Sequence, residues 1–215
     1  MKFSISDITD QHLTTSIAHE YLKCRDCFNL FVQNESLKIK INTKEIRIRS
    51  YNLYSDFLLH LYEFYVGCFK RDRKSTEEIH WVALDKLFTS EAQKLIDNSA
   101  DRIRNGRAPT WENDISYYQV SVPDEFGMHF RRIRNRHGHV DYKRASGEEI
   151  TLSEFFRKCH KFIYILYSTP AWIWQVNDIE NYDFRSIEEF EIAIIEANPQ
   201  NNYTHQPHKA HKICL

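Results

Sequence analysis

The sequence predicts an all-α fold, an up-and-down helical bundle of four to six helices with at most one short β-hairpin. Gly and Pro number only five each among 215 residues, too few for the many tight turns of a β-sandwich or barrel. The sequence also contains no internal repeat. Apolar residues instead recur at steps of three and four over several long stretches, which is the spacing of one face of an α-helix.

The first long helix is expected over about residues 10–34. Its apolar face consists of Leu13, Ile17, Tyr21, Cys24, Phe28 and Phe31. A second helix, over about 52–70, is apolar nearly all round. A helix with so much apolar surface is either central in the bundle or shared with a second subunit.

Between these two helices, the segment 37–49 changes its period. Ile39, Ile41, Ile46 and Ile48 alternate with Lys and Arg on either side of an Asn-Thr-Lys-Glu stretch. A period of two is typical of half-buried strands. The pattern therefore predicts a short β-hairpin here, attached to the helical core.

Two further helical faces follow, at 81–95 and 152–166. Thr151 and Glu154 form a predicted capping box at the start of the second of these. A last short helix is expected just before residue 198. Residues 1–198 are thus predicted to form a single domain, and the polar, His-containing stretch 199–215 to be a solvated, disordered tail.

The composition and the apolar pattern constrain the localisation of the protein and its binding partners. A formal net charge of -1 provides no global basic field, so a nucleic-acid site would have to be local. The N-terminus lacks the apolar region of a secretory signal, and Asp56, His60 and Glu63 interrupt the strongest apolar run, which argues against a membrane span. The sequence contains five Cys residues, an odd number, and most of them fall on the apolar faces of predicted helices. We expect a cytoplasmic protein.

The segment 130–144 is the candidate functional site, because six Lys and Arg residues stand there against one acid, Asp141. Within it, Arg134 is followed by Asn135 and then, at a helix end marked by Gly138, by His139. A guanidinium can hold a phosphate through two parallel hydrogen bonds, and an imidazole exchanges protons near neutral pH. These groups suit chemistry on a phosphodiester.

The pattern Arg134-Asn135-x-x-x-His139 resembles the Arg-x4-6-His signature of the HEPN superfamily, small all-helical proteins that include metal-independent endoribonucleases. The resemblance implies that Arg134 binds the scissile phosphate, that His139 is a general acid or base, and that Asn135 orients one of them. It implies RNA as substrate, because the ribose 2′-hydroxyl is the nucleophile. It implies no metal and no other cofactor.

The resemblance also bears on partners. It implies a homodimer in which two motifs meet in one cleft, and a role as a toxin or antiphage effector under the control of an antitoxin or other regulatory protein. The excess apolar surface of the second helix points to a dimer as well. The residues expected to contact RNA beside the catalytic ones are Arg131, Arg132, Arg136, His137, Lys143 and Arg144.

Two other classes of function remain open. His137-x-His139-x-Asp141 matches the first part of the metal-binding motif of metallo-β-lactamase-like hydrolases, although Tyr142 stands where that motif continues with His. The third class is a non-catalytic helical protein, such as an antitoxin, a sensor or a nucleotide-binding or RNA-binding protein, since one fold can carry many functions. Cleavage of RNA in EDTA, cleavage only with zinc, or no cleavage distinguishes the three.

Overall fold

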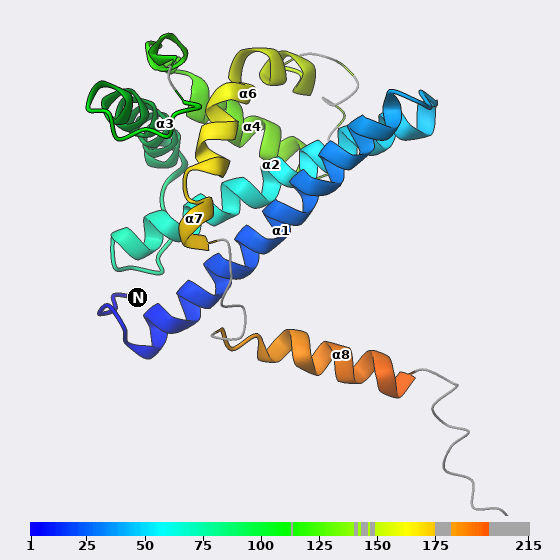
Figure 1. Ribbon diagram of the computed structural model, residues 1–215. Coiled ribbons are helices and arrows are strands. Elements are labelled where there is room, and N and C mark those ends of the chain that lie inside the picture. Colours follow the sequence, from blue (N-terminus) through cyan, green and yellow to red (C-terminus); the bar gives the residue numbers. More distant parts are fainter. Residues whose placement is uncertain (113, 140–141, 143–145, 147–148, 175–181, 198–215) are drawn as a thin grey trace, which may run out of the picture. The chain divides into compact units, whose positions relative to one another are not determined.

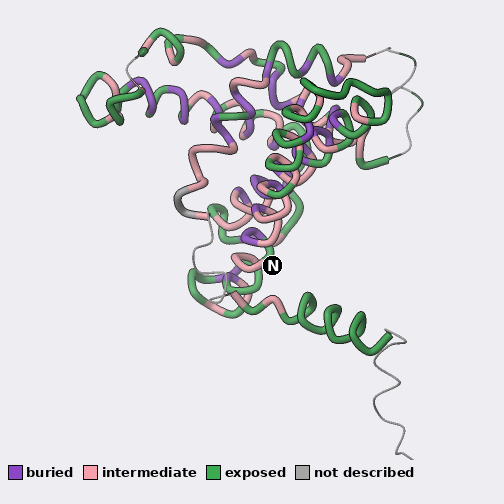
Figure 2. The backbone as a smooth tube through the Cα atoms, turned by 45° about the vertical axis from the view of Figure 1, so that its right-hand side comes forward, coloured by how far each residue is buried: buried purple, intermediate pink, exposed green. Residues whose placement is uncertain are grey.

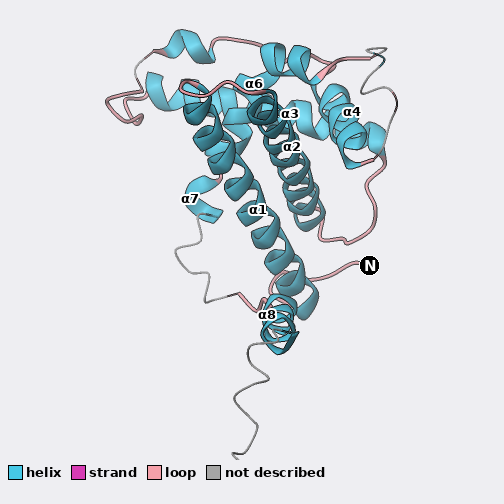
Figure 3. Ribbon diagram, turned by 90° about the vertical axis from the view of Figure 1, so that its right-hand side faces the viewer, coloured by secondary structure: helices cyan, strands magenta, loops and turns pink. Residues whose placement is uncertain are grey.

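The computed structural model describes the chain except for residues 113, 140–141, 143–145, 147–148, 175–181 and 198–215 and the side chains of 172–173. Its described part is all-helical, as predicted, with no strand and only an isolated bridge between Lys2 and Ser75 (Figures 1 and 3). The chain divides into two compact units, Met1–Asn177 and Asp178–Leu215. The first contains α1 (Ile8–Lys38), α2 (Lys44–Asp72), α3 (Trp81–Arg104), the 3-10 helix η1 (Ile115–Tyr118), α4 (Phe126–Gly138), α6 (Leu152–Ser168) and α7 (Ala171–Trp174), and the second contains α8 (Arg185–Ala197).

Helices α1 and α2 are long, lie side by side and run in opposite directions, as Figures 1 and 3 show. The chain turns between them over residues 39–43. Thr43 is the N-cap of α2, and its side chain accepts a hydrogen bond from the Ile46 amide at 3.3 Å. This cap satisfies one of the amide groups that a helix start leaves without a partner, and it fixes where α2 begins.

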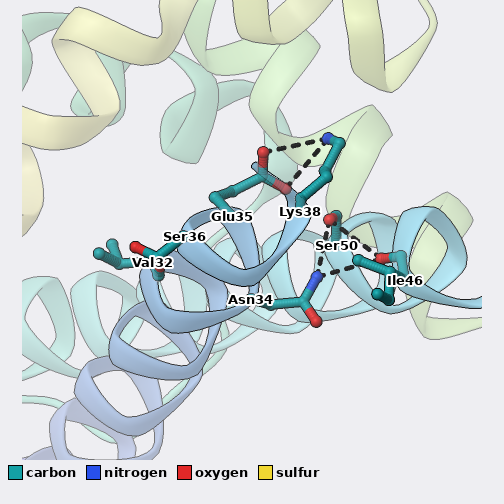
Figure 4. A network of polar contacts seen from close by, with 7 residues as sticks. All are labelled: Val32, Asn34, Glu35, Ser36, Lys38, Ile46 and Ser50. Atoms are coloured by element: carbon teal, nitrogen blue, oxygen red, sulfur yellow. Dashed lines mark hydrogen bonds and ion pairs between the residues drawn. The ribbon is translucent and has the colours of Figure 1, made fainter. Parts of the chain in front are cut away.

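The predicted β-hairpin at 37–49 is therefore wrong. Its first two residues end α1 and residues 44–49 form the first turns of α2, while Ile39 is 88% exposed instead of half-buried. The buried Asn34 supplies the reason, because its Nδ2 donates to the Ile46 carbonyl at 3.0 Å and to Ser50 Oγ at 2.8 Å (Figure 4). These bonds hold the start of α2 against the end of α1, and together with the Thr43 cap they outweigh the two-residue alternation.

Helix α2 is central in the first unit. The Phe57 ring packs on Phe28 of α1 with centroids 4.9 Å apart. The Tyr62 ring stacks on Phe88 of α3 at 4.5 Å and meets Phe130 of α4 edge-on at 5.2 Å. Figure 2 shows the buried residues gathered where these helices meet. Of the two explanations for the apolar surface of α2, the central position is thus confirmed, and that surface no longer argues for a second subunit.

Helices α3 and α4 pack on each other and on α2, and α6 contacts both of them as well as Phe28 of α1. Gly127 lets α4 approach α3 closely, and its amide donates to Thr89 Oγ1 at 3.1 Å. Aromatic rings of α4 stack on Phe155 of α6. The capping box of Thr151 and Glu154 is present as predicted. Together these contacts position the end of α4, which carries the candidate site.

The second unit contributes α8, whose apolar side chains, Phe190 among them, are exposed. The predicted tail at 199–215 lies outside the described residues. None of the described helices combines the length and the apolar character needed to cross a bilayer.

Candidate functional site

The candidate site lies on α4, which is amphipathic. Phe126, Phe130 and Ile133 are fully buried against the core, as their spacing predicts. Arg134 and Asn135 follow directly and remain partly exposed. The helix ends at Gly138, and His139 adopts an extended backbone with φ -133° and ψ 156°. The apolar face of α4 therefore fixes the helix, and its last turn presents the polar residues.

Arg134 is held in place from three sides. Its Nη1 donates to Asn135 Oδ1 at 2.9 Å, and its Nη2 donates to the carboxylate of Glu63 on α2. The guanidinium carbon also lies 5.5 Å from the centre of the Tyr62 ring. Burial raises the pKa of Tyr62 to about 12, so the ring faces the cation as a neutral phenol. The side chain of Arg134 keeps 29% of its surface exposed.

This arrangement leaves Arg134 able to bind a further anion. A guanidinium has five N–H donors in one plane. Among the described residues, the hydrogen bonds to Asn135 and Glu63 are its polar contacts, so a second N–H on each terminal nitrogen is left for a ligand. A phosphate oxygen is a suitable acceptor for those donors.

Glu63 is the site residue that the sequence reasoning missed. It appeared only as one of three polar residues that interrupt the apolar run of α2. A charged residue in such a helix needs a partner, and that signal could have found it. Another of the three, His60, is paired likewise, with Glu20 of α1 at 2.8 Å. The identity of the partner, however, depends on how α4 packs on α2.

Two of the cations predicted to contact RNA are instead tied into the fold. Arg131 makes two hydrogen bonds to the carboxylate of Asp85, at 2.8 and 2.9 Å, and lies over the Trp81 ring. Arg136 is only 4% exposed and donates to the Ile150 carbonyl at 2.7 Å and to Glu149 at 2.9 Å. The expectation that Arg136 contacts RNA is therefore corrected, since its buried guanidinium is bound to Glu149 and Ile150 just before α6.

The remaining predicted residues divide into three groups. Arg132 and His139 are exposed. His137 is half-buried, and its ring meets the Tyr51 ring of α2 edge-on with centroids 5.2 Å apart. Lys143 and Arg144 lie outside the described residues. The structure thus brings Arg134 and Asn135 together directly, places His139 beyond them at the helix end, and leaves Arg132 as the exposed cation of α4.

The metal alternative depends on Asp141, which also lies outside the described residues. Within the part of the chain that the structure covers, no three His, Cys, Asp or Glu side chains gather as metal ligands would. Cys24 and Cys27 are free thiols on α1, and burial raises the pKa of both. They behave as core side chains.

Comparison with known proteins identifies no relative. No family model, no curated protein and no solved structure matches this chain.

Proposed function

We propose that this chain is a metal-independent endoribonuclease, with Arg134, Asn135 and His139 as its catalytic residues. One observation carries the proposal. The partly exposed Arg134 guanidinium is held between Asn135 and Glu63 at the end of α4, where the chain leaves the helix and exposes His139. Cleavage of a phosphodiester through the 2′-hydroxyl uses a cation that binds the phosphate and a group that exchanges protons, and Arg134 and His139 supply these two groups at one helix end.

The residues would divide the reaction as follows. Arg134 donates its remaining N–H groups to the non-bridging oxygens of the scissile phosphate, where negative charge grows. His139 takes the proton of the 2′-hydroxyl while water protonates the departing 5′-oxygen, or His139 protonates that oxygen while water takes the proton of the 2′-hydroxyl. The bond from the 2′-oxygen to phosphorus forms as the bond to the 5′-oxygen breaks, which leaves a 2′,3′-cyclic phosphate and a 5′-hydroxyl. DNA lacks the 2′-hydroxyl and is not a substrate.

Glu63 has a positioning role in this proposal. It neutralises part of the charge of Arg134 in the resting protein and keeps the guanidinium plane in one orientation. Asn135, which accepts from the same guanidinium, holds its other side. Arg132 is the exposed cation that would attract the RNA backbone.

The proposal includes a homodimer that works in the cytoplasm as a toxin or antiphage effector, with an antitoxin or other regulatory protein as partner. This part rests on the resemblance to HEPN proteins alone, because the apolar surface of α2 is used within one chain. Sedimentation at micromolar concentration tests the dimer, and a monomeric mass would count against it.

Incubation of the purified protein with total RNA in EDTA tests the activity. We expect cleavage by the wild type, and loss of cleavage by at least about 100-fold in His139→Ala and Arg134→Ala. Arg134→Lys should recover little, because a point charge cannot reproduce the planar fork. The products should end in a cyclic phosphate.

Two matched variants serve as controls. His137→Ala removes a neighbouring imidazole and should retain cleavage while lowering the melting temperature, since the ring packs on Tyr51. Arg132→Ala should weaken RNA binding and its salt dependence only. An active His139→Ala beside an inactive His137→Ala would overturn the assignment. Absence of cleavage under all conditions would favour the non-catalytic alternative, and cleavage only with added zinc would favour a metal hydrolase.

A further inference from the structure

A second feature of the first unit is an open pocket between the end of α1, the start of α2 and the start of α6. Its volume is about 330 Å³, which is the size range of small-ligand sites. The pocket is lined by aromatic and cationic side chains. They include Phe31, Tyr51, Tyr54, Phe156, Lys38 and Arg157.

The aromatic wall is ordered by its own contacts. Tyr54 lies between Phe31 and Phe156, with ring centroids 5.1 Å from each. Its hydroxyl is hydrogen-bonded to His160 Nδ1 at 2.9 Å, and Phe156 stacks on the His160 ring at 4.4 Å. Burial raises the pKa of Tyr54 and lowers that of His160, so a neutral phenol meets a neutral imidazole. Phe156 nevertheless remains 38% exposed, and such a ring can stack on a planar ligand.

The polar side of the pocket carries charge. Lys38 is paired with Glu35 at 3.0 Å, and Ser50 is fixed by the Asn34 amide, as Figure 4 shows. Arg157 is exposed, and the hydrogen bonds and ion pairs of the described residues do not involve it. A guanidinium at the rim of an aromatic pocket suits an anionic group attached to a planar ring.

The pocket adjoins the candidate active site through one ring. Tyr51 lines the pocket and packs edge-on against His137, which lies two residues before His139. The Tyr51 ring therefore links the pocket to the last turn of α4.

We infer that this pocket binds the base of one nucleotide of the RNA, next to the phosphate that is cleaved. The base stacks on the exposed Phe156 ring, which the buried Tyr54 supports from behind. The phosphate of the same nucleotide faces Arg157. The placement of this base next to the cleaved phosphate rests on the proposed function. The binding itself needs no cleavage, so the two ideas can be tested separately.

Titration calorimetry with GMP, AMP and UMP in EDTA tests the binding. We expect the wild type to bind at least one of them, and Phe156→Ala to weaken that binding by about 10-fold or more, because stacking on an aromatic ring dominates such sites. The control is Tyr164→Ala, which removes a ring of similar exposure, 44%, on the same helix but outside the pocket. It should bind as the wild type does.

The same nucleotide titrations, carried out on charge-removing variants, test the role of Arg157. Arg157→Ala should weaken nucleotide binding severalfold and reduce its salt dependence, whereas Lys158→Ala, the exposed neighbour outside the pocket lining, should not. Arg134→Ala should keep nucleotide binding while losing RNA cleavage. Binding without cleavage in the wild type would reject the nuclease and keep the pocket. Unchanged binding in Phe156→Ala, or no binding of any of the three nucleotides, would overturn the pocket assignment.

Discussion

Gly127 sets the distance between α3 and α4, and its replacement by Ala is the most direct test of how α4 is held. A Cβ at this position would lie 2.7 Å from the Asp85 carbonyl carbon and 2.8 Å from the Asp85 Cα, with the carbonyl oxygen closer still. All three are backbone atoms of α3, so no rotation of a side chain relieves the contact. Gly127→Ala therefore forces α4 away from α3.

The expected change in the free energy of unfolding is the sum of two opposing effects. Overpacking of a core costs about 1–3 kcal/mol, and a backbone clash belongs at or above the upper end of that range. The helix preference of Ala over Gly returns up to about 1 kcal/mol. A net loss of about 2–3 kcal/mol is a large part of the stability of a typical domain. For a chain of this length it corresponds to a fall in Tm of about 4–12 °C.

Thermal unfolding followed by circular dichroism measures this loss, with Gly138→Ala as the control in the same helix. The nearest atom to a Cβ at Gly138 is Leu59 Cδ1 at 4.0 Å, an ordinary contact, so that variant should match or slightly exceed the wild type. A Tm for Gly127→Ala within about 2 °C of the wild type would refute the close approach of the two helices.

Two further predictions concern buried charge. Arg136→Ala should lower the free energy of unfolding by about 2–4 kcal/mol in urea, because it removes a buried guanidinium that is hydrogen-bonded to Ile150 and Glu149. Arg132→Ala, at an exposed position, should stay within about 0.5 kcal/mol of the wild type. Equal effects would contradict the placement of Arg136. Burial alone would raise the pKa of Glu20, but hydrogen bonds from His60 and Lys23 hold it at about 2. Because this folded-state pKa is depressed, the stabilisation by Glu20 is present above its unfolded value of about 4.5 and is lost as the pH falls toward 2. The Tm difference between the wild type and Glu20→Gln should therefore shrink across that window, and a difference independent of pH would disprove the pairing.

The end of α1 and the start of α2 differ most from the structure that their sequence pattern predicts. The alternation of Ile with Lys and Arg at 37–49 is a genuine period of two, yet the segment is helix and turn. Two residues favour the helical conformation of this segment. Thr43 caps α2, and the side-chain amide of Asn34 donates to a carbonyl in the first turn of that helix. The cap could have been recognised in the sequence, because Thr followed by an acidic residue in the next turn marks a helix start. The bond from Asn34 could not, since it depends on how the two helices cross.

The sequence by itself determined the helical class, the buried faces of the long helices, the capping box at Thr151 and the adjacency of Arg134 and Asn135 on α4. These features depend on residues within a few positions of each other, where spacing fixes which side chains share a face or a turn. Only the tertiary structure decided that Glu63, 71 residues away, holds Arg134, that Arg131 meets Asp85 across 46 residues, and that Arg136 is buried while Arg132 is not. A charged side chain takes the partner that packing brings within reach, and packing is a property of the whole core that no local pattern contains.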